Sequence, residues 1–269
     1  MDMTAATLTA DRRSPLAGNL DTSWLKWVAL CFMMIDHLGV AVFGNLPEMR
    51  MLGRIALPVY VWCLVVGCEF THDIYRYALR LLVLAVISQP INMIALQNPW
   101  SKLNILFLLA LGVLSIAGIQ KKRFGSQFWA PILCFIFLGY VKVDYGWKGL
   151  AFILLIYASR KSLGGLAAVF LAYTMFWGTT NSQITSIFGI ELTFLAWPSI
   201  GPVLQPFFRM QAMMWMALPF IVIPTHINLK LPKWLGYGFY PLHLLLIIVI
   251  RLLIMGDSAS TLLSVLSTF

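Results

Sequence analysis

The sequence predicts an all-α, polytopic transmembrane helix bundle of about ten spans with cytoplasmic N- and C-termini. Of the 269 residues, 60% are hydrophobic and only 11% are charged, whereas soluble domains contain about 25% charged residues. The mean hydropathy is +0.85, and the apolar residues form repeated runs that approach the length of about 20 residues needed to cross a bilayer. The basic residues gather in the short connections between these runs, as membrane insertion requires.

Ten apolar segments are candidate spans, because charged or turn-forming residues separate them. The sixth is short and could form a bent or re-entrant unit with the fifth. The eighth contains Pro198 and Pro202 and is followed at once by Pro206, so we expect a broken helix whose backbone is satisfied by neighbouring helices or by a cavity. In chain order the candidate spans are 24–43, 54–70, 76–96, 103–119, 127–142, 147–158, 163–178, 186–205, 209–223 and 235–255.

The basic residues also predict the orientation of these spans. With a cytoplasmic N-terminus, twelve of the 19 Lys and Arg residues fall on the cytoplasmic side and seven on the opposite side. This bias favours both termini inside, and "KKR" at 121–123 and "RK" at 160–161 are its strongest markers. The net charge of +9 then reflects topology and an anionic lipid surface, so the predicted partner is the lipid bilayer and not nucleic acid.

The chain divides into a tail and one membrane domain. Residues 1–23 are polar and lack the apolar core of a cleavable signal peptide, so we predict a flexible N-terminal tail. Residues 24–269 contain no long polar insertion and form a single transmembrane domain. The four cysteines lie within apolar runs without a CxxC pair, which indicates buried thiols and no metal site.

An aspartate and a histidine, Asp36 and His37, lie side by side within the first span, where both side chains are costly. At 1.5 Å per residue, His37 lies roughly 20 Å along the helix, in the outer half of the bilayer. Ionisable residues inside a membrane usually face a bundle interior or a wet cavity and usually serve function. The same counting places these further polar residues at or near the outer face: Arg54, Asn92, Asp144, Tyr145, Tyr240 and His243.

Several of these residues also have a purely structural interpretation. Asp36 and Arg54 could form a structural ion pair, His243 could be a buried histidine that donates to a carbonyl, and Asp144 could lie in a solvated loop. Because Asp36 and His37 are neighbours, about 100° apart around a helix, they cannot both face one point. We therefore expect one to hold the helix in place while the other, His37, carries the chemistry.

The residue types narrow the chemistry without settling it. The sequence contains no nucleotide-binding loop, metal triad or GxSxG nucleophile elbow. A histidine with nearby carboxylates, arginines and amides is suited to moving protons near neutral pH. That arrangement fits general-base catalysis of group transfer, and it fits proton-coupled transport equally well.

The order and spacing of several segments resemble the TraX family. The resemblance covers about residues 25–155 and then the last span, and the segments are specific as a set. A Glu-Gly pair common in the family after the second span is replaced here by "VVG", followed by "CEFTHD". The matching segments are "LKWVALCFMMIDHLGVAVFGN" (25–45), "RMLGRIALPVYVWCLVVG" (50–67), "YRYALRLLVLAVISQPINM" (75–93), "LNILFLLALGVL" (103–114), "DYGWKGLAFILL" (144–155) and "FYPLHLLLI" (239–247).

The resemblance implies an integral-membrane acetyltransferase of the bacterial inner membrane, with a transmembrane acyltransferase-like domain. TraX-like proteins take acetyl groups from cytosolic acetyl-CoA, and the founding member acetylates a conjugative pilin. The implied partners are therefore acetyl-CoA and a cell-envelope acceptor, either a pilin amino terminus or a glycan. On this view the phosphates of CoA would bind basic residues of the inner face: Arg76, Arg80, Arg123, Arg160 and Lys161.

The resemblance also suggests roles for the outer polar residues. His37 would take a proton from the acceptor, Asp36 or Asp144 would orient the imidazole, and His243 would be a second proton carrier. A covalent acetyl-His37 intermediate is a variant. Arg54 or Asn92 would bind the acceptor or stabilise the oxyanion, with Tyr145 and Tyr240 lining the acceptor site. The alternatives are a proton-coupled transporter and a structural partner of a pilus or secretion system.

Overall fold

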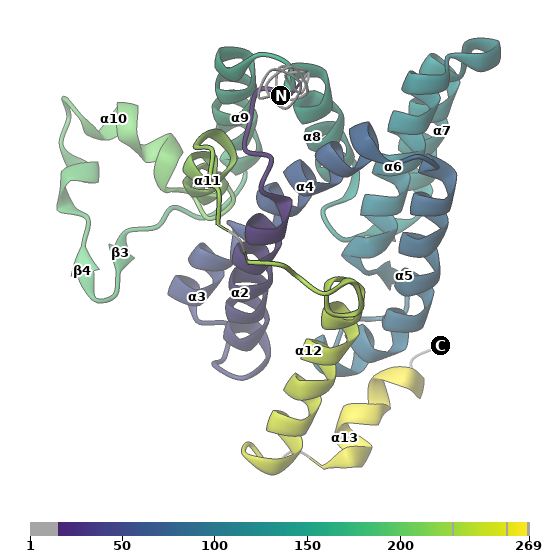
Figure 1. Cartoon of the computed structure of the whole chain (residues 1–269). Coiled ribbons are helices and arrows are strands. Elements are labelled where there is room, and N and C mark those ends of the chain that lie inside the picture. The colour runs from purple at the N-terminus through teal and green to yellow at the C-terminus, as the bar shows by residue number, and fades with distance from the viewer. Residues whose placement is uncertain (1–15, 228, 257, 268–269) are drawn as a thin grey trace, which may run out of the picture.

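The computed structural model describes residues 16–227, 229–256 and 258–267, and helices dominate it (Figure 1). The α-helices are α2 (Thr22–Ala41), α3 (Pro47–Gly53), α4 (Ala56–Phe70), α5 (Ile74–Leu96), α6 (Ile105–Lys121), α7 (Ser126–Tyr140), α8 (Gly146–Ser159), α9 (Leu163–Gly178), α10 (Gly201–Leu204), α11 (Leu218–Val222), α12 (Lys233–Leu253) and α13 (Ala259–Leu263). The 3₁₀ helices are η1 (Arg123–Gly125), η2 (Thr193–Ala196), η3 (Gln205–Phe208), η4 (Ala212–Ala217) and η5 (Ser264–Ser267). The strands are β1 (Lys102–Leu103), β2 (Lys142–Val143), β3 (Ser186–Ile187) and β4 (Ile190–Glu191).

Three segments of the described chain are long and apolar enough to cross a membrane, namely Thr22–Ala41, Pro47–Phe70 and Ile74–Leu96. The middle segment comprises α3 and α4. Further apolar helices of 10–17 residues pack beside them. The helical membrane class is therefore confirmed, and the number of ten spans stays a prediction.

Side-chain caps fix where several of these helices begin. The Asp21 carboxylate accepts the Trp24 N–H at 3.2 Å at the start of α2, and Asn104 accepts the Leu106 N–H at 3.0 Å at the start of α6. Asp73 caps α5 by accepting the N–H groups of Tyr75 and Arg76. Donation to the ionised carboxylate, above all by the Arg76 N–H, lowers the pKa of Asp73 below its ordinary value.

The eighth predicted span, 186–205, is not one continuous helix. It forms the β3–β4 hairpin and the short helices η2 and α10, which project from the bundle at the left of Figure 1. Phe188 and Gly189 between the strands both have positive φ, the geometry of a tight hairpin turn. Prolines at 198, 202 and 206 explain why no long helix forms, as the predicted break anticipated.

The last long helix runs in the same direction as the first, which differs from the antiparallel arrangement predicted. Thr22 at the start of α2 and Pro232 at the start of α12 line one cavity. Farther along both helices, His37 contacts His243. The reason lies in the projecting lobe: the chain leaves the bundle after Gly178 and returns beside it at Ala212, so this lobe adds no crossing.

This direction separates the two described ends of the chain. Residues 16–21 lie at the end of the bundle where α2 begins, and Asn19 there is fully buried and accepts the Trp62 indole N–H. The C-terminal α13 lies beside the far end of α5, where Gln97 donates to the Leu262 carbonyl. The two described ends of the chain thus lie at opposite ends of the bundle, and the cytoplasmic placement of both termini stays a prediction. Residues 16–23 of the predicted tail, 1–23, belong to the packed part of the chain, and residues 1–15 lie outside the described residues.

Two outer connections are joined by a short parallel ladder. Strand β1 pairs with β2 in the register Lys102 to Lys142 and Leu103 to Val143. The Asp144 N–H continues the ladder by donating to the Leu103 carbonyl at 2.9 Å. This pairing brings Asp144 beside Lys102, residues that the sequence places in separate connections.

A close approach of α2 and α3 depends on Gly53. A Cβ atom at this position would lie 2.2 Å from the Asp36 Cβ, far inside contact distance. Gly53→Ala should therefore push α3 away from α2 and destabilise the protein by about 1–3 kcal/mol, as overpacking does. Thermal unfolding in detergent measures the change. The matched control is Gly139→Ala in α7, where a Cβ would meet nothing within 4 Å. Equal melting temperatures for the two variants would contradict this packing.

Candidate functional site

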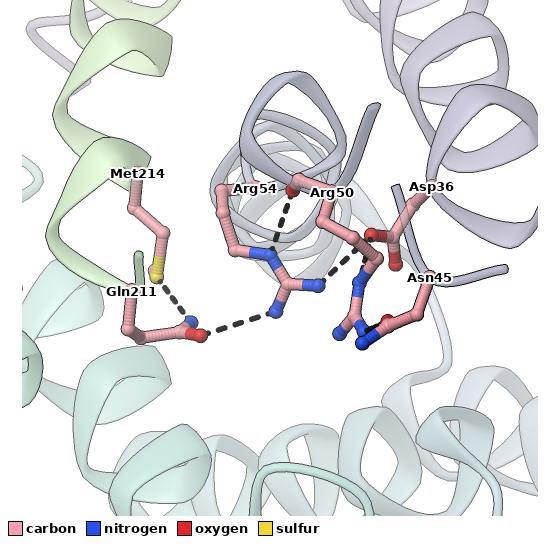
Figure 2. Close-up of polar contacts among 6 residues, drawn as sticks. All are labelled: Asp36, Asn45, Arg50, Arg54, Gln211 and Met214. Atoms are coloured by element: carbon pink, nitrogen blue, oxygen red, sulfur yellow. Dashed lines mark hydrogen bonds and ion pairs between the residues drawn. The ribbon is translucent and has the colours of Figure 1, made fainter. Parts of the chain in front are cut away.

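Asp36 is held by two arginines, Arg50 of α3 and Arg54 directly after α3 (Figure 2). Its Oδ1 accepts Arg50 Nε at 3.1 Å and Arg54 Nη2 at 2.9 Å. Arg54 is 6% exposed and also donates to Gln211 at 3.1 Å, while Arg50 also donates to Asn45. The two arginines stand one helical turn apart, so both guanidinium groups reach the same carboxylate. The ion pair that the sequence suggested between Asp36 and Arg54 is therefore present.

His37 is paired with the other predicted histidine, His243 of α12. The distance from His37 Nδ1 to His243 Nε2 is 2.7 Å, and the two ring planes are inclined by only 13°. The other nitrogen of His243, Nδ1, lies 2.8 Å from the Phe239 carbonyl oxygen. His243 is 2% exposed, so the pair is held inside the bundle where α2 meets α12.

The Phe239 carbonyl fixes the proton positions of this pair. A carbonyl oxygen only accepts, so His243 carries its proton on Nδ1 and leaves Nε2 as an acceptor. His37 must then donate from Nδ1, which assigns a lone pair to His37 Nε2. That nitrogen has no hydrogen-bond partner within the described residues. The assignment makes His37 a base whose accepting nitrogen is free and whose ring orientation is set by His243.

The other outer residues form three contacts near this pair. Asn92 of α5 donates to the Tyr240 hydroxyl at 3.3 Å, and Tyr240 lies one turn before His243 on α12. Asp144 accepts Lys102 Nζ at 2.7 Å. Tyr145 packs edge-to-face on Trp177, with ring centroids 5.8 Å apart. The prediction that these residues gather at one end of the bundle thus matches the structure, but neither carboxylate contacts His37.

A cavity of about 630 Å³ runs beside this cluster. Its wall is largely apolar and comes from α2, α4, α5, α6 and the start of α12. Lys26 and Arg80 line it on the side where α2 and α5 begin, and Met33 and Tyr240 line it near the histidine pair. Met33 and Tyr240 each precede one of the histidines by about one helical turn, so the pair lies just beyond the end of this cavity.

The predicted inner basic residues do not share one pocket. Arg80 lines the cavity, whereas Arg76 pairs with Asp73 at 3.0 Å. Arg160 pairs with Glu69 at 3.1 Å, Arg123 lies over the Phe124 ring, and Lys161 is exposed. Only Arg80 of these five therefore adjoins the cavity.

Sequence reasoning missed three residues that complete the site. Gln211 binds Arg54 from the base of the projecting lobe, and Lys102 pairs with Asp144. Lys26 joins Arg80 at the cavity. A Lys or Gln near an apolar run carries no signal of its partner, because each contact joins residues from different helices or connections.

Fold and site together define a membrane protein with a histidine pair and an arginine–carboxylate cluster inside a helical bundle. A family model described as "TraX protein" matches residues 21–251. The chain belongs to the TraX family.

Relatives add little beyond this membership. The chain is 30% identical over 136 residues to the uncharacterized protein RP591 of Rickettsia prowazekii (strain Madrid E), which covers 49% of this chain. The chain thus spans about half of that relative's length, 52%. No solved structure matches.

The ion pair at Asp36 yields a stability prediction. Asp36→Asn leaves the buried Arg54 guanidinium without its counter-charge, and removing one partner of a buried pair costs about 3–5 kcal/mol. We expect a clear fall in the detergent melting temperature. The control is Asp73→Asn, whose ion pair with Arg76 is exposed and whose new side chain still caps a helix. A melting temperature for Asp36→Asn equal to that of the unmodified protein would show that Arg54 does not need this carboxylate.

Proposed function

We propose that this chain is an acetyltransferase of the bacterial cytoplasmic membrane. It moves the acetyl group of cytosolic acetyl-CoA to an acceptor at the opposite face, either a pilin amino terminus or a cell-envelope glycan. Membership of the TraX family supports this reaction class. The single observation that carries the proposal is the free base at His37, lying just beyond a cavity that has basic residues toward its other end.

The histidine pair supports the catalytic role of His37. Its Nε2 has a lone pair and no partner in the described chain, and His243 holds the opposite nitrogen at 2.7 Å. A general base must be neutral before the reaction and must keep a fixed orientation toward the proton it takes. The Phe239 carbonyl supplies that orientation through His243. His243 therefore acts here as a positioning residue and not as a second proton carrier.

The cavity supports a binding site for the acetyl donor. Its volume of about 630 Å³ lies within the range of about 300–1,000 Å³ that is typical of small-molecule pockets. Acetyl-CoA carries phosphates at one end and a slender arm with the thioester at the other. Lys26 and Arg80 suit the phosphates, and the apolar wall suits the arm. This placement would bring the thioester toward Tyr240 and the histidine pair.

The proposed reaction follows from these positions. The acceptor nitrogen or oxygen forms a bond to the thioester carbonyl carbon as its proton passes to His37 Nε2. The carbon–sulfur bond then breaks, and the CoA thiolate leaves and takes the proton from His37. The products are the acetylated acceptor and CoA with a free thiol, and His37 returns to its neutral state.

The histidine pair gives the first functional test. General acid–base catalysis typically contributes about 10²–10⁴-fold, so His37→Ala should lower the rate of acetyl transfer by that amount. His243→Ala should also lower it, because His37 then loses its orientation. The assay incubates the purified full chain in detergent with radiolabelled acetyl-CoA and an envelope extract, and follows labelled acceptor and free thiol. The control is His226→Ala, at an exposed histidine. A fully active, folded His37→Ala protein would refute the proposal.

The cavity gives a second test. Arg80→Ala removes one of the two cations beside the proposed donor site, so the KM for acetyl-CoA should rise about tenfold while kcat changes little, as the loss of uniform binding does. Steady-state kinetics with varied acetyl-CoA measures both constants. The control is Lys122→Asn, which removes an exposed charge outside the cavity and keeps a residue that tolerates the positive φ there. An unchanged KM for Arg80→Ala would place the donor elsewhere.

A further inference from the structure

A chain of hydrogen bonds connects the outer surface to the cavity. Lys102 Nζ donates to Asn98 Oδ1 at 3.4 Å, and Asn98 Nδ2 donates to Asn92 Oδ1 at 3.3 Å. Asn92 Nδ2 then donates to the Tyr240 hydroxyl oxygen at 3.3 Å. This series of hydrogen bonds begins at the half-exposed Lys102 and ends at the buried Tyr240, which lines the cavity.

Lys102 fixes which group donates and which accepts in each of these hydrogen bonds. An ammonium group only donates, so Asn98 must present its oxygen to Lys102 and its NH₂ group to Asn92. Asn92 must then present its own NH₂ group to Tyr240. Reversing either amide would set two donors or two acceptors against each other, and such a mismatch is costly inside an apolar bundle.

The hydroxyl proton of Tyr240 therefore takes no part in these hydrogen bonds. Its oxygen accepts from Asn92, and its proton has no acceptor within the described residues. The side chain lines the cavity, and its ring centroid lies 5.5 Å from that of His243. A free hydrogen-bond donor thus stands where the proposed donor site meets the histidine pair.

We infer that Tyr240 is a catalytic residue whose hydroxyl donates the hydrogen bond that stabilises the oxyanion of acetyl transfer, and that Lys102, Asn98 and Asn92 position it. This inference rests on the proposed function. When the acceptor bonds to the thioester carbon, the carbonyl π electrons move onto its oxygen, and Tyr240 hydrogen-bonds that oxygen without giving up its proton. The carbonyl re-forms as the carbon–sulfur bond breaks.

The two residues that sequence reasoning assigned to the oxyanion bind other partners and do not line the cavity. Arg54 donates from all three of its nitrogens, to the Arg50 carbonyl, Gln211 and Asp36. Asn92 uses its NH₂ group on Tyr240. Within the described part of this cluster, Tyr240 presents an uncommitted donor at the cavity.

Two nearly isosteric variants test this role with the acetyl-CoA assay above. Tyr240→Phe removes the donor and should lower kcat by about 10²–10³, the usual effect of losing one oxyanion donor, with the KM for acetyl-CoA within twofold. Asn92→Asp keeps the hydroxyl but replaces its hydrogen-bond donor with a carboxylate that only accepts. The Tyr240 proton should turn to this carboxylate, so kcat should again fall at nearly constant KM.

Variants of Lys102, at the outer end of the hydrogen-bond series, test whether these residues position Tyr240. Lys102→Met removes the group that sets the direction, so kcat should fall, whereas Lys102→Arg keeps a group that only donates and should restore most of it. Lys142→Met is the matched control, because Lys142 is exposed and pairs with Lys102 across the β1–β2 ladder. It should leave kcat unchanged.

The outcomes separate this inference from the proposed function. An inactive His37→Ala protein beside a Tyr240→Phe or Asn92→Asp protein with unchanged kcat would overturn the inference alone. A rise in KM without a fall in kcat would also overturn it, because Tyr240 would then only bind substrate. If Tyr240→Phe fails to fold, Asn92→Asp decides. Full activity of His37→Ala would instead overturn the proposed function itself.

Discussion

The contact between His37 and His243 is the interaction on which the site depends. It joins α2 to α12 across 206 residues of sequence, so these helices must run side by side and meet at this level. Tyr240 lies one turn earlier on α12, and the same packing brings it to the cavity and to Asn92 of α5. One contact thus determines which helices enclose the cavity and which side chains stand where it ends.

Two groups, one that can only accept and one that can only donate, fix the direction of the hydrogen bonds in the site. Histidine, asparagine and tyrosine can each donate or accept, so these side chains alone would permit several proton arrangements. The Phe239 carbonyl only accepts, and the Lys102 ammonium only donates. Starting from these two anchors, each bond has one consistent direction. One chain of bonds ends in the lone pair of His37, and the other ends in the free proton of Tyr240.

Residue counting predicted the neighbourhood of the site but not its partners. The rise per residue placed Asp36, His37, Arg54 and Asn92 near one end of the bundle, because depth along a helix follows directly from sequence position. The 100° separation of Asp36 and His37 correctly implied separate contacts, because Asp36 binds Arg54 and His37 meets His243. The partners could not be deduced, because which faces of α2, α3 and α12 meet is decided by packing such as that between Gly53 and Asp36.

Hydropathy alone wrongly predicted a membrane span at 186–205, where turn geometry decides the fold. Segment 186–205 is apolar enough for a span, yet the positive φ values of Phe188 and Gly189 and its prolines favour a hairpin and short helices. Because this lobe returns to where it left the bundle, the direction of α12 reverses relative to the prediction. A count of apolar runs cannot detect such an excursion, and each miscounted run changes the side on which all later residues lie.

The distribution of charge supports the proposal that an imidazole, and not a carboxylate, is the proton acceptor. Asp36 is paired with Arg50 and Arg54, and Asp144 is paired with Lys102. Protonating either carboxylate would leave buried or half-buried cations uncompensated, which is costly in an apolar bundle. The histidine pair is neutral as assigned, so His37 can take a proton without first breaking a salt bridge. In the proposed reaction the nearby carboxylates therefore hold α3 and the outer connections in place, and His37 takes the proton.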